Sequence, residues 1–298
     1  MGDCVINLFI KKKEKKLEKA DLVKIAKELH QEAFDANSYY LIMLQYHDFR
    51  KQYDAEMQLS PAFYQVIYGA LMKACFMEIA KLYDSSKNVV SIGSMLELCL
   101  NNINLFPEYR DTWAVEDNGT KYSFPVPFQH HLKPEEECFF KKQVESQRRV
   151  FAVFDVPSPD TVPVSVDLTF PEFLDLYLKR FHSLSKKQEN IRRQRNTIYA
   201  HNDEERIKDI DSITKKYPIS YPDIKELIDF ALDCTGLIIG SLTDVCKATQ
   251  YSNIDDWEGT LMLAKLGLKY QEYDQHQKEK AFMKELKHNL CGGKNIDP

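Results

Sequence analysis

The residues best suited to do chemistry lie in the stretch Asn190–Glu205, where Arg195 and His201 stand with five residues between them. An arginine side chain is always charged and carries several N–H donors, whereas a histidine side chain titrates near neutral pH. On a helix, two such groups about two turns apart could act on one phosphate group. The pair therefore indicates a site that binds and reacts with phosphate.

The elements before this stretch place Arg195 on an apolar helix face. The apolar residues recur at steps of three, four or seven: Phe173, Tyr177, Phe181, Leu184, Ile191 and Ile198. Arg195 falls on the same face if the helix is unbroken, and a guanidinium away from water needs an anion or several acceptors. A structural ion pair for Arg195 and a helix-end role for His201, next to Asn202 and Asp203, remain open as alternatives.

The charge of the chain is mildly negative overall and positive near this stretch. Lys and Arg total 40 against 45 Asp and Glu, which argues against general nucleic-acid binding. Between residues 179 and 195, only Glu189 opposes a set of cations: Lys179, Arg180, Lys186, Lys187, Arg192, Arg193 and Arg195. Any such binding must be local, at a patch of about six net positive charges beside Arg195.

The cysteines and the apolar runs predict a cytoplasmic protein without metal or cofactor. The seven cysteines are scattered and lack the close pairs of a zinc site. His130-His131 has no clustered acid or cysteine, and no glycine-rich phosphate loop is present. The longest uncharged run, residues 57–72, is shorter than the roughly 20 apolar residues that cross a bilayer. We expect no secretory leader and no membrane contact.

Hydrophobic periodicity predicts a mainly α protein, an antiparallel helical bundle. A first helix is expected over 11–53, and a second begins at Ser60-Pro61. The second should bury one stripe, formed by Phe63, Ile67, Leu71, Cys75, Ile79 and Leu82. Ser91 should cap a third helix that stops before Pro107. Residues 14–106 and 169–286 would form the bundle.

Residues 107–168 differ from the rest and predict a small α+β insertion. Seven of the 12 prolines lie here. Asn118-Gly119 predicts a β-hairpin, because both residues tolerate positive φ. A helix should begin at Pro134, and 162–168 should form at most an edge strand. The insertion could be a lid or a partner-binding module.

Two capping signals, a last helix and a terminal segment complete the expected bundle. Thr169 and Glu172 form a capping box before the helix that ends in the Arg195 stretch. Ser220 should begin a fifth helix, in which Gly236 and Gly240 would admit a close neighbour. A last helix starts near Asp255, and 287–298 should be a disordered tail.

Two sequence blocks resemble the HEPN superfamily. Arg195-Asn196, three further residues and Ala200-His201-Asn202-Asp203 are similar to its signature of an arginine, a polar residue and a histidine. Ile79–Asp84, a polar loop and Ser91–Leu96 are similar to the abortive-infection U-type branch of HEPN proteins. The resemblance implies a helical bundle, commonly a homodimer in which two motif helices meet.

The resemblance also implies a function, metal-independent cleavage of RNA, with a role in phage defence or a toxin module. His201 and Arg195 would be catalytic, Asn196 would bond within the site, and Asn202 and Asp203 would support it. The flanking phosphates of the RNA would be bound by Lys187, Arg192 and Arg193. An antitoxin or another regulatory partner would be expected. One alternative is a non-catalytic interaction or nucleotide-binding module. Another is a chain modified by a nucleotidyltransferase, which is disfavoured because Tyr199 precedes His201.

Overall fold

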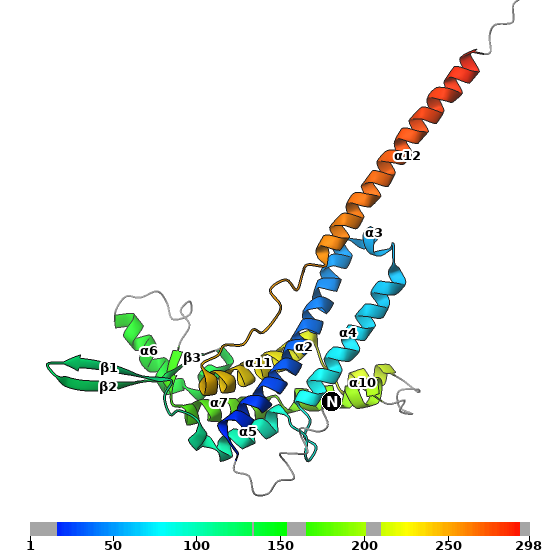
Figure 1. Cartoon of the computed structure of the whole chain (residues 1–298). Helices are drawn as coiled ribbons and strands as arrows, with labels where there is room; N and C mark the ends of the chain where they lie inside the picture. Colours follow the sequence, from blue (N-terminus) through cyan, green and yellow to red (C-terminus); the bar gives the residue numbers. More distant parts are fainter. Residues whose placement is uncertain (1–16, 133, 154–164, 201–209, 293–298) are drawn as a thin grey trace, which may run out of the picture. The chain divides into compact units, whose positions relative to one another are not determined.

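The computed structural model describes residues 17–132, 134–153, 165–200 and 210–292 (Figure 1). These residues are mainly α-helical, which confirms the predicted class. The helices are α2 (Lys19–Gln52), α3 (Asp54–Met57), α4 (Pro61–Leu82), α5 (Ile92–Asn101), η1 (Ile103–Leu105), η2 (Pro134–Phe139), α6 (Lys141–Val153), α7 (Phe170–Ser183), α8 (Ser185–Gln194), η3 (Arg195–Ala200), α10 (Ile210–Lys216), α11 (Tyr221–Thr243) and α12 (Glu258–Gly292). The strands are β1 (Asp111–Asp117), β2 (Thr120–Val126), β3 (Phe128–His131) and β4 (Ser165–Leu168).

The chain divides into two compact units. The first unit consists of residues 1–37 and 76–249, and the second of residues 38–75 and 250–298. The predicted division into a bundle of 14–106 and 169–286 with an insertion of 107–168 places its boundaries elsewhere and stays a prediction.

Three of the predicted helix starts agree with the structure. Ser91 and Ser94 form a capping box at α5, as do Thr169 and Glu172 at α7. At α11, the backbone N–H of Asp223 donates to the Ser220 hydroxyl at 3.3 Å, and Ser220 donates to the Asp223 carboxylate. These side chains satisfy amides that lack a partner in the first turn.

The predicted unbroken helix from Thr169 through the Arg195 stretch is wrong. α7 ends at Ser183, α8 begins at Ser185, and η3 follows as a π-helical segment. No glycine or proline marks the break, and Leu184 between the two helices is buried with φ −82° and ψ −1°. The break changes which side chains share a face, so the spacing of apolar residues does not show which helix face Arg195 occupies.

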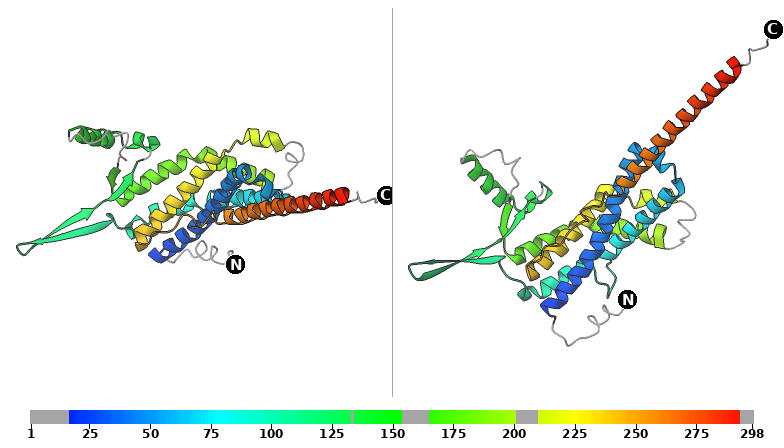
Figure 2. Two further views of the ribbon diagram at one scale, coloured as in Figure 1. Left: turned by 90° about the horizontal axis from the view of Figure 1, so that it is seen from above. Right: turned by 45° about the horizontal axis from the view of Figure 1, so that its top comes forward.

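The residues of 107–168 form two small sheets and a helix. β1 pairs with β2 in antiparallel register around a turn in which Asn118 and Gly119 have φ of 49° and 78° (Figure 2). Every residue of this hairpin is exposed. β3 pairs with β4, which confirms a short strand at the end of the region, while residues 162–164 lie outside the described residues. The predicted α-helix start at Pro134 is wrong: Pro134 opens the 3-10 segment η2, and the α-helix α6 begins at Lys141.

The core of the first unit is built from helices α2, α4, α5, α7, α8 and α11. It contains large side chains with no more than 1% exposure: Leu22, Ile79, Leu82, Ile92, Met95, Leu96, Leu174, Phe170, Ile191 and Phe230. Figures 1 and 2 show α7 and α11 side by side in this unit. The helices bury their apolar faces against one another, as in other helical bundles.

The predicted buried stripe of α4 is wrong in its first half. Cys75, Ile79 and Leu82 are fully buried, whereas Phe63 is 58% exposed and Ile67 is 36% exposed. The second unit has a smaller core, in which Tyr53, Met57 and Leu261 pack with Phe49 and Trp257. Apolar spacing shows that a helix has one apolar face, and it does not show how far along the helix that face is covered.

The last helix is longer than predicted. α12 continues to Gly292, past residue 287 where a disordered tail is expected, and residues 293–298 lie outside the described residues. None of the described helices is both long and apolar enough to cross a bilayer.

Candidate functional site

Arg195 opens the π-helical segment η3, directly after α8. Its side chain is 20% exposed, and its Nη2 lies 3.6 Å from the Oδ2 of Asp84. Its Nε is buried and has no hydrogen-bond partner among the described residues. Among the described residues, the guanidinium is thus held by one long ionic contact, and its Nε remains unsatisfied, which is costly away from water unless a ligand accepts.

Asp84 follows the end of α4 and is itself held in place. The backbone N–H of Ser86 donates to its Oδ1 at 2.8 Å. Burial raises the pKa of Asp84, but the hydrogen bonds from Ser86 and the charges of Arg195 and Arg192 outweigh it, so the pKa is lowered from 3.8. The carboxylate is therefore ionised at neutral pH and is available to position Arg195.

The block that carries Asp84 is fixed by the core beside it. The buried Tyr83 donates its hydroxyl proton to the carbonyl oxygen of Leu227 at 2.6 Å. Its ring stacks on Phe181, and a Cβ at Gly93 would lie 2.9 Å from that same Phe181 ring. Only glycine lets α5 approach α7 here without a shift of Phe181. The first resembling block thus packs on α7 and α11, and the Asp84–Arg195 pair joins it to the second block.

Arg192 also reaches the loop after α4, since its Nη1 donates a hydrogen bond to the hydroxyl of Ser85. Arg193 is more exposed and has Glu189 at 3.6 Å from its Nε. Asn196 is exposed, whereas Thr197 beside it is buried. Within three residues of Arg195 along the chain lie Arg192, Arg193 and Asn196.

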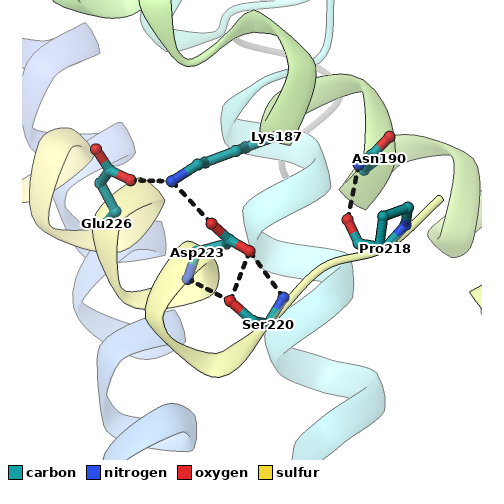
Figure 3. Close-up of polar contacts among 6 residues, drawn as sticks. All are labelled: Lys187, Asn190, Pro218, Ser220, Asp223 and Glu226. Carbon is teal, nitrogen blue, oxygen red and sulfur yellow. Dashed lines mark hydrogen bonds and ion pairs between the residues drawn. The ribbon is translucent and has the colours of Figure 1, made fainter.

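Lys187 forms a joint between α8 and α11 (Figure 3). Its Nζ lies 2.8 Å from Asp223 and also donates to Glu226. Hydrogen bonds from Lys187 and Ser220 lower the pKa of Asp223 to about 2, and the two carboxylates raise the pKa of Lys187. A phosphate at Lys187 would have to compete with both carboxylates.

Two buried amides hold the chain just before α11. The amide nitrogen of Asn190 donates to the carbonyl of Pro218 at 2.7 Å, as Figure 3 shows. The amide nitrogen of Gln194 donates to the carbonyl of Tyr217 at 2.6 Å. These bonds fix the last turns of α8 and thereby the backbone from which Arg195 projects.

The other predicted site residues, His201, Asn202 and Asp203, lie outside the described residues. The site assignment therefore stays a prediction. Among the described residues, no group of three or more His, Cys, Asp and Glu side chains is arranged to hold a metal ion.

The predicted basic patch is partly neutralised by local acids. Besides Lys187 and Arg193, Lys179 pairs with Asp175 at 2.6 Å. Sequence reasoning did not assign Asp84 or Ser85 to the site, although Asp84 was part of the resembling block. A signal was available, because a cation on an apolar face requires an anion, and Asp84 ends the only block that the resemblance linked to Arg195.

Comparison with known proteins gives one family. The family model described as AbiU2, of the HEPN group, matches residues 19–260. No curated protein and no solved structure matches the chain significantly. The matched region includes both Asp84 and Arg195.

Proposed function

Because the chain belongs to the HEPN AbiU2 family, we propose that it is a metal-independent endoribonuclease that acts as an effector of abortive infection. One observation carries the proposal. The two blocks that resemble the family are far apart in the sequence, yet they meet at Asp84 and Arg195, 3.6 Å apart. The contact leaves a partly shielded cation with an unsatisfied donor, which suits an anionic ligand.

The chemistry proposed for this site uses the 2′-hydroxyl of RNA as the internal nucleophile. His201 would move a proton to or from the reacting oxygens, which is worth roughly 10²–10⁴-fold in rate. Arg195 would hold the scissile phosphate and stabilise the charge that develops on it, a comparable factor. Asn196 would bond within the site, supported by Asn202 and Asp203.

Asp84 is a positioning residue in this proposal. Its carboxylate is anchored by Ser86 and restricts the Arg195 guanidinium before RNA arrives. The donors that Asp84 does not use, including Nε, would be offered to phosphate oxygens. Arg192 and Arg193 would bind flanking phosphates, with Lys187 contributing where its two carboxylates allow.

The proposed active species is a homodimer in which two motif helices meet, as the family resemblance implies. Two Arg195 side chains in one cleft would then act on the same phosphodiester chain. The Asp84 carboxylates would reduce the repulsion between these cations in the absence of RNA. A partner that restrains the nuclease, such as an antitoxin, fits the same proposal.

Incubation of the purified full-length protein with several RNAs in EDTA tests the proposal. Cleavage is expected from the wild type, with losses of at least about 100-fold in His201→Ala and Arg195→Ala. Arg149→Ala, which removes an exposed arginine of α6, is the matched control and should retain activity. Intact RNA across all substrates, or equal cleavage by His201→Ala, would refute the nuclease.

A non-catalytic interaction or nucleotide-binding module is the second candidate, and one observation favours it. Arg195 has a local carboxylate partner, as a purely structural arginine would. In that case Arg195→Ala would lower stability and leave RNA untouched in the same assay, while binding of RNA or a nucleotide could persist.

A further inference from the structure

The first half of α4 presents an apolar stripe to solvent. Every residue of the stripe is exposed: Ala62, Phe63, Val66, Gly69, Ala70 and Lys73. At 3.6 residues per turn, these residues lie within about 60° of Val66 around the helix. We call them the α4 stripe, and Val66 at its centre is 69% exposed.

The α4 stripe carries almost no charge. Lys73 is its only ionisable residue, and the chain has no charged residue from Met57 to Met72. A soluble protein normally covers such a face, because a helix that is apolar on several sides belongs in an interior. No charge pattern selects a charged partner here, so a partner surface must be equally neutral.

The order of large and small residues makes the stripe complementary to itself. Phe63 lies on one side of Val66, and Gly69 and Ala70 lie on the other. A Cβ built at Gly69 would meet nothing within 4 Å, so there is open space above it. A two-fold rotation about Val66 would place each Phe63 ring over Gly69 and Ala70 of the other copy, and Ala62 against Ala70.

We propose that the α4 stripe is a self-association surface, on which α4 of a second copy of this chain packs in antiparallel orientation. A two-fold interface uses the same patch on both subunits, which the stripe provides. Small residues at 69 and 70 permit close approach of the two helices. This surface is separate from the motif helix and does not depend on the nuclease.

An aromatic cleft adjoins the stripe within the second unit. Its volume is about 450 Å³, and α4 contributes Phe63, Ile67 and Leu71 to its wall. The opposite wall includes Tyr46 and Trp257. Phe63 therefore borders both the stripe and the cleft, so the two apolar surfaces are continuous along α4.

The first test is the mass of the full-length chain by analytical ultracentrifugation. Val66→Glu would place two carboxylates opposite each other on the two-fold axis, and like charges in an interface cost several kcal/mol. We expect self-association to weaken on the order of 100-fold. Circular dichroism should show unchanged helix content, since position 66 is exposed.

Leu263→Glu is the matched control. Leu263 is an apolar residue of α12 in the same unit, and its exposure of 70% nearly equals that of Val66. Its replacement should change self-association by less than about twofold. If the motif helix also pairs, the wild type contains four chains and Val66→Glu two; if it does not, the numbers are two and one. A monomeric wild type, an unchanged Val66→Glu or an equal effect of Leu263→Glu would overturn the proposal.

Crosslinking identifies the occupant as a second copy. Val66→Cys should form a disulfide-linked dimer on mild oxidation, because residues on the two-fold axis face their own equivalents. Gln65→Cys, exposed on a neighbouring face of α4, should not exceed the background of the natural exposed Cys138 and Cys246. Equal crosslinking of both variants would contradict the antiparallel geometry.

Discussion

Lys187 and Arg195 are two cations from one continuous stretch of chain, and they meet carboxylates in different ways. Lys187 lies between two acids, Asp223 at 2.8 Å and Glu226, which tie α8 to α11. Arg195 has one acid among the described residues, Asp84 at 3.6 Å, and a buried Nε without a hydrogen-bond partner there. The sequence predicts phosphate binding for both residues.

The difference indicates which cation is available for a ligand. The charge of Lys187 is more than balanced, and its contacts join two helices that build the core. Within the part of the chain that the structure describes, the charge of Arg195 is balanced once, by a contact longer than a hydrogen bond, which leaves donors for an incoming anion. The comparison therefore assigns structure chiefly to Lys187 and ligand binding chiefly to Arg195.

Conservative exchanges at the two positions should give the largest contrast. Arg195→Lys should slow RNA cleavage on the order of 100-fold, because an ammonium cannot present two parallel donors to a phosphate. Lys187→Arg should keep the rate within about threefold, since a guanidinium can still pair with Asp223 and Glu226. Single-turnover rates would measure both, and equal losses would remove the distinction between the two cations.

Removal of the single carboxylate at Arg195 should have a smaller effect. Asp84→Asn is expected to lower kcat about tenfold, as for other residues that orient a reacting group. KM should stay unchanged or fall, because the lost negative charge no longer opposes RNA. The control is Asp48→Asn, which replaces an exposed aspartate that pairs with Lys51. A rise in KM with unchanged kcat would exclude a positioning role.

The joint at Lys187 should show itself in stability instead. Lys187→Met is expected to lower the free energy of unfolding by about 1 kcal/mol, a value limited by the partial exposure of the pair. Lys225→Met, which breaks a similarly exposed i,i+4 pair with Asp229 within α11, should cost only about 0.3–0.5 kcal/mol. Urea unfolding measures both, and a smaller loss for Lys187→Met than for Lys225→Met would count against the joint.

The pH dependence of stability should carry a last and smaller signature. The pKa of Asp223 is about 2 in the folded chain against a usual 3.8. As the pH falls, Asp223 is therefore protonated in the unfolded chain before it is protonated in the folded chain. The stabilisation is fully present above pH 3.8 and is lost as pH falls toward about 2. We expect Asp223→Asn to lack this part of the loss, less than about 1 kcal/mol, in unfolding measured across that range. Identical pH profiles would show that the Lys187 contact adds nothing to stability.

Much of the fold could be predicted because its signals are local. Capping residues such as Ser91, Thr169 and Ser220 and the Asn118-Gly119 turn act within a few residues of themselves. The break at Leu184 and the π-helical segment η3 carry no such signal, because a helix end without glycine or proline depends on the packing around it.

The site could be predicted only in part for the same reason. The sequence shows that Arg195 needs an anion, and the resemblance supplies the block that contains Asp84. Which acid pairs with which cation depends on how α8 packs against its neighbouring helices. The pairing of Lys187 with Asp223 and Glu226 of α11 therefore cannot be predicted from spacing. The exposure of Phe63 was missed because an apolar stripe has the same spacing whether a neighbouring helix or a second chain covers it.

The π-helical segment has a consequence for engineering and evolution. A π turn accommodates one residue more than the α-helical ladder would, so η3 tolerates a length change that α8 would not. Deleting Thr197 would allow ordinary i to i−4 bonding to resume and would rotate Ile198 by about 100° around the helix relative to Arg195. In homologues that differ in length by one residue here, the sequence motif would stay recognisable, whereas its side chains would point in another direction.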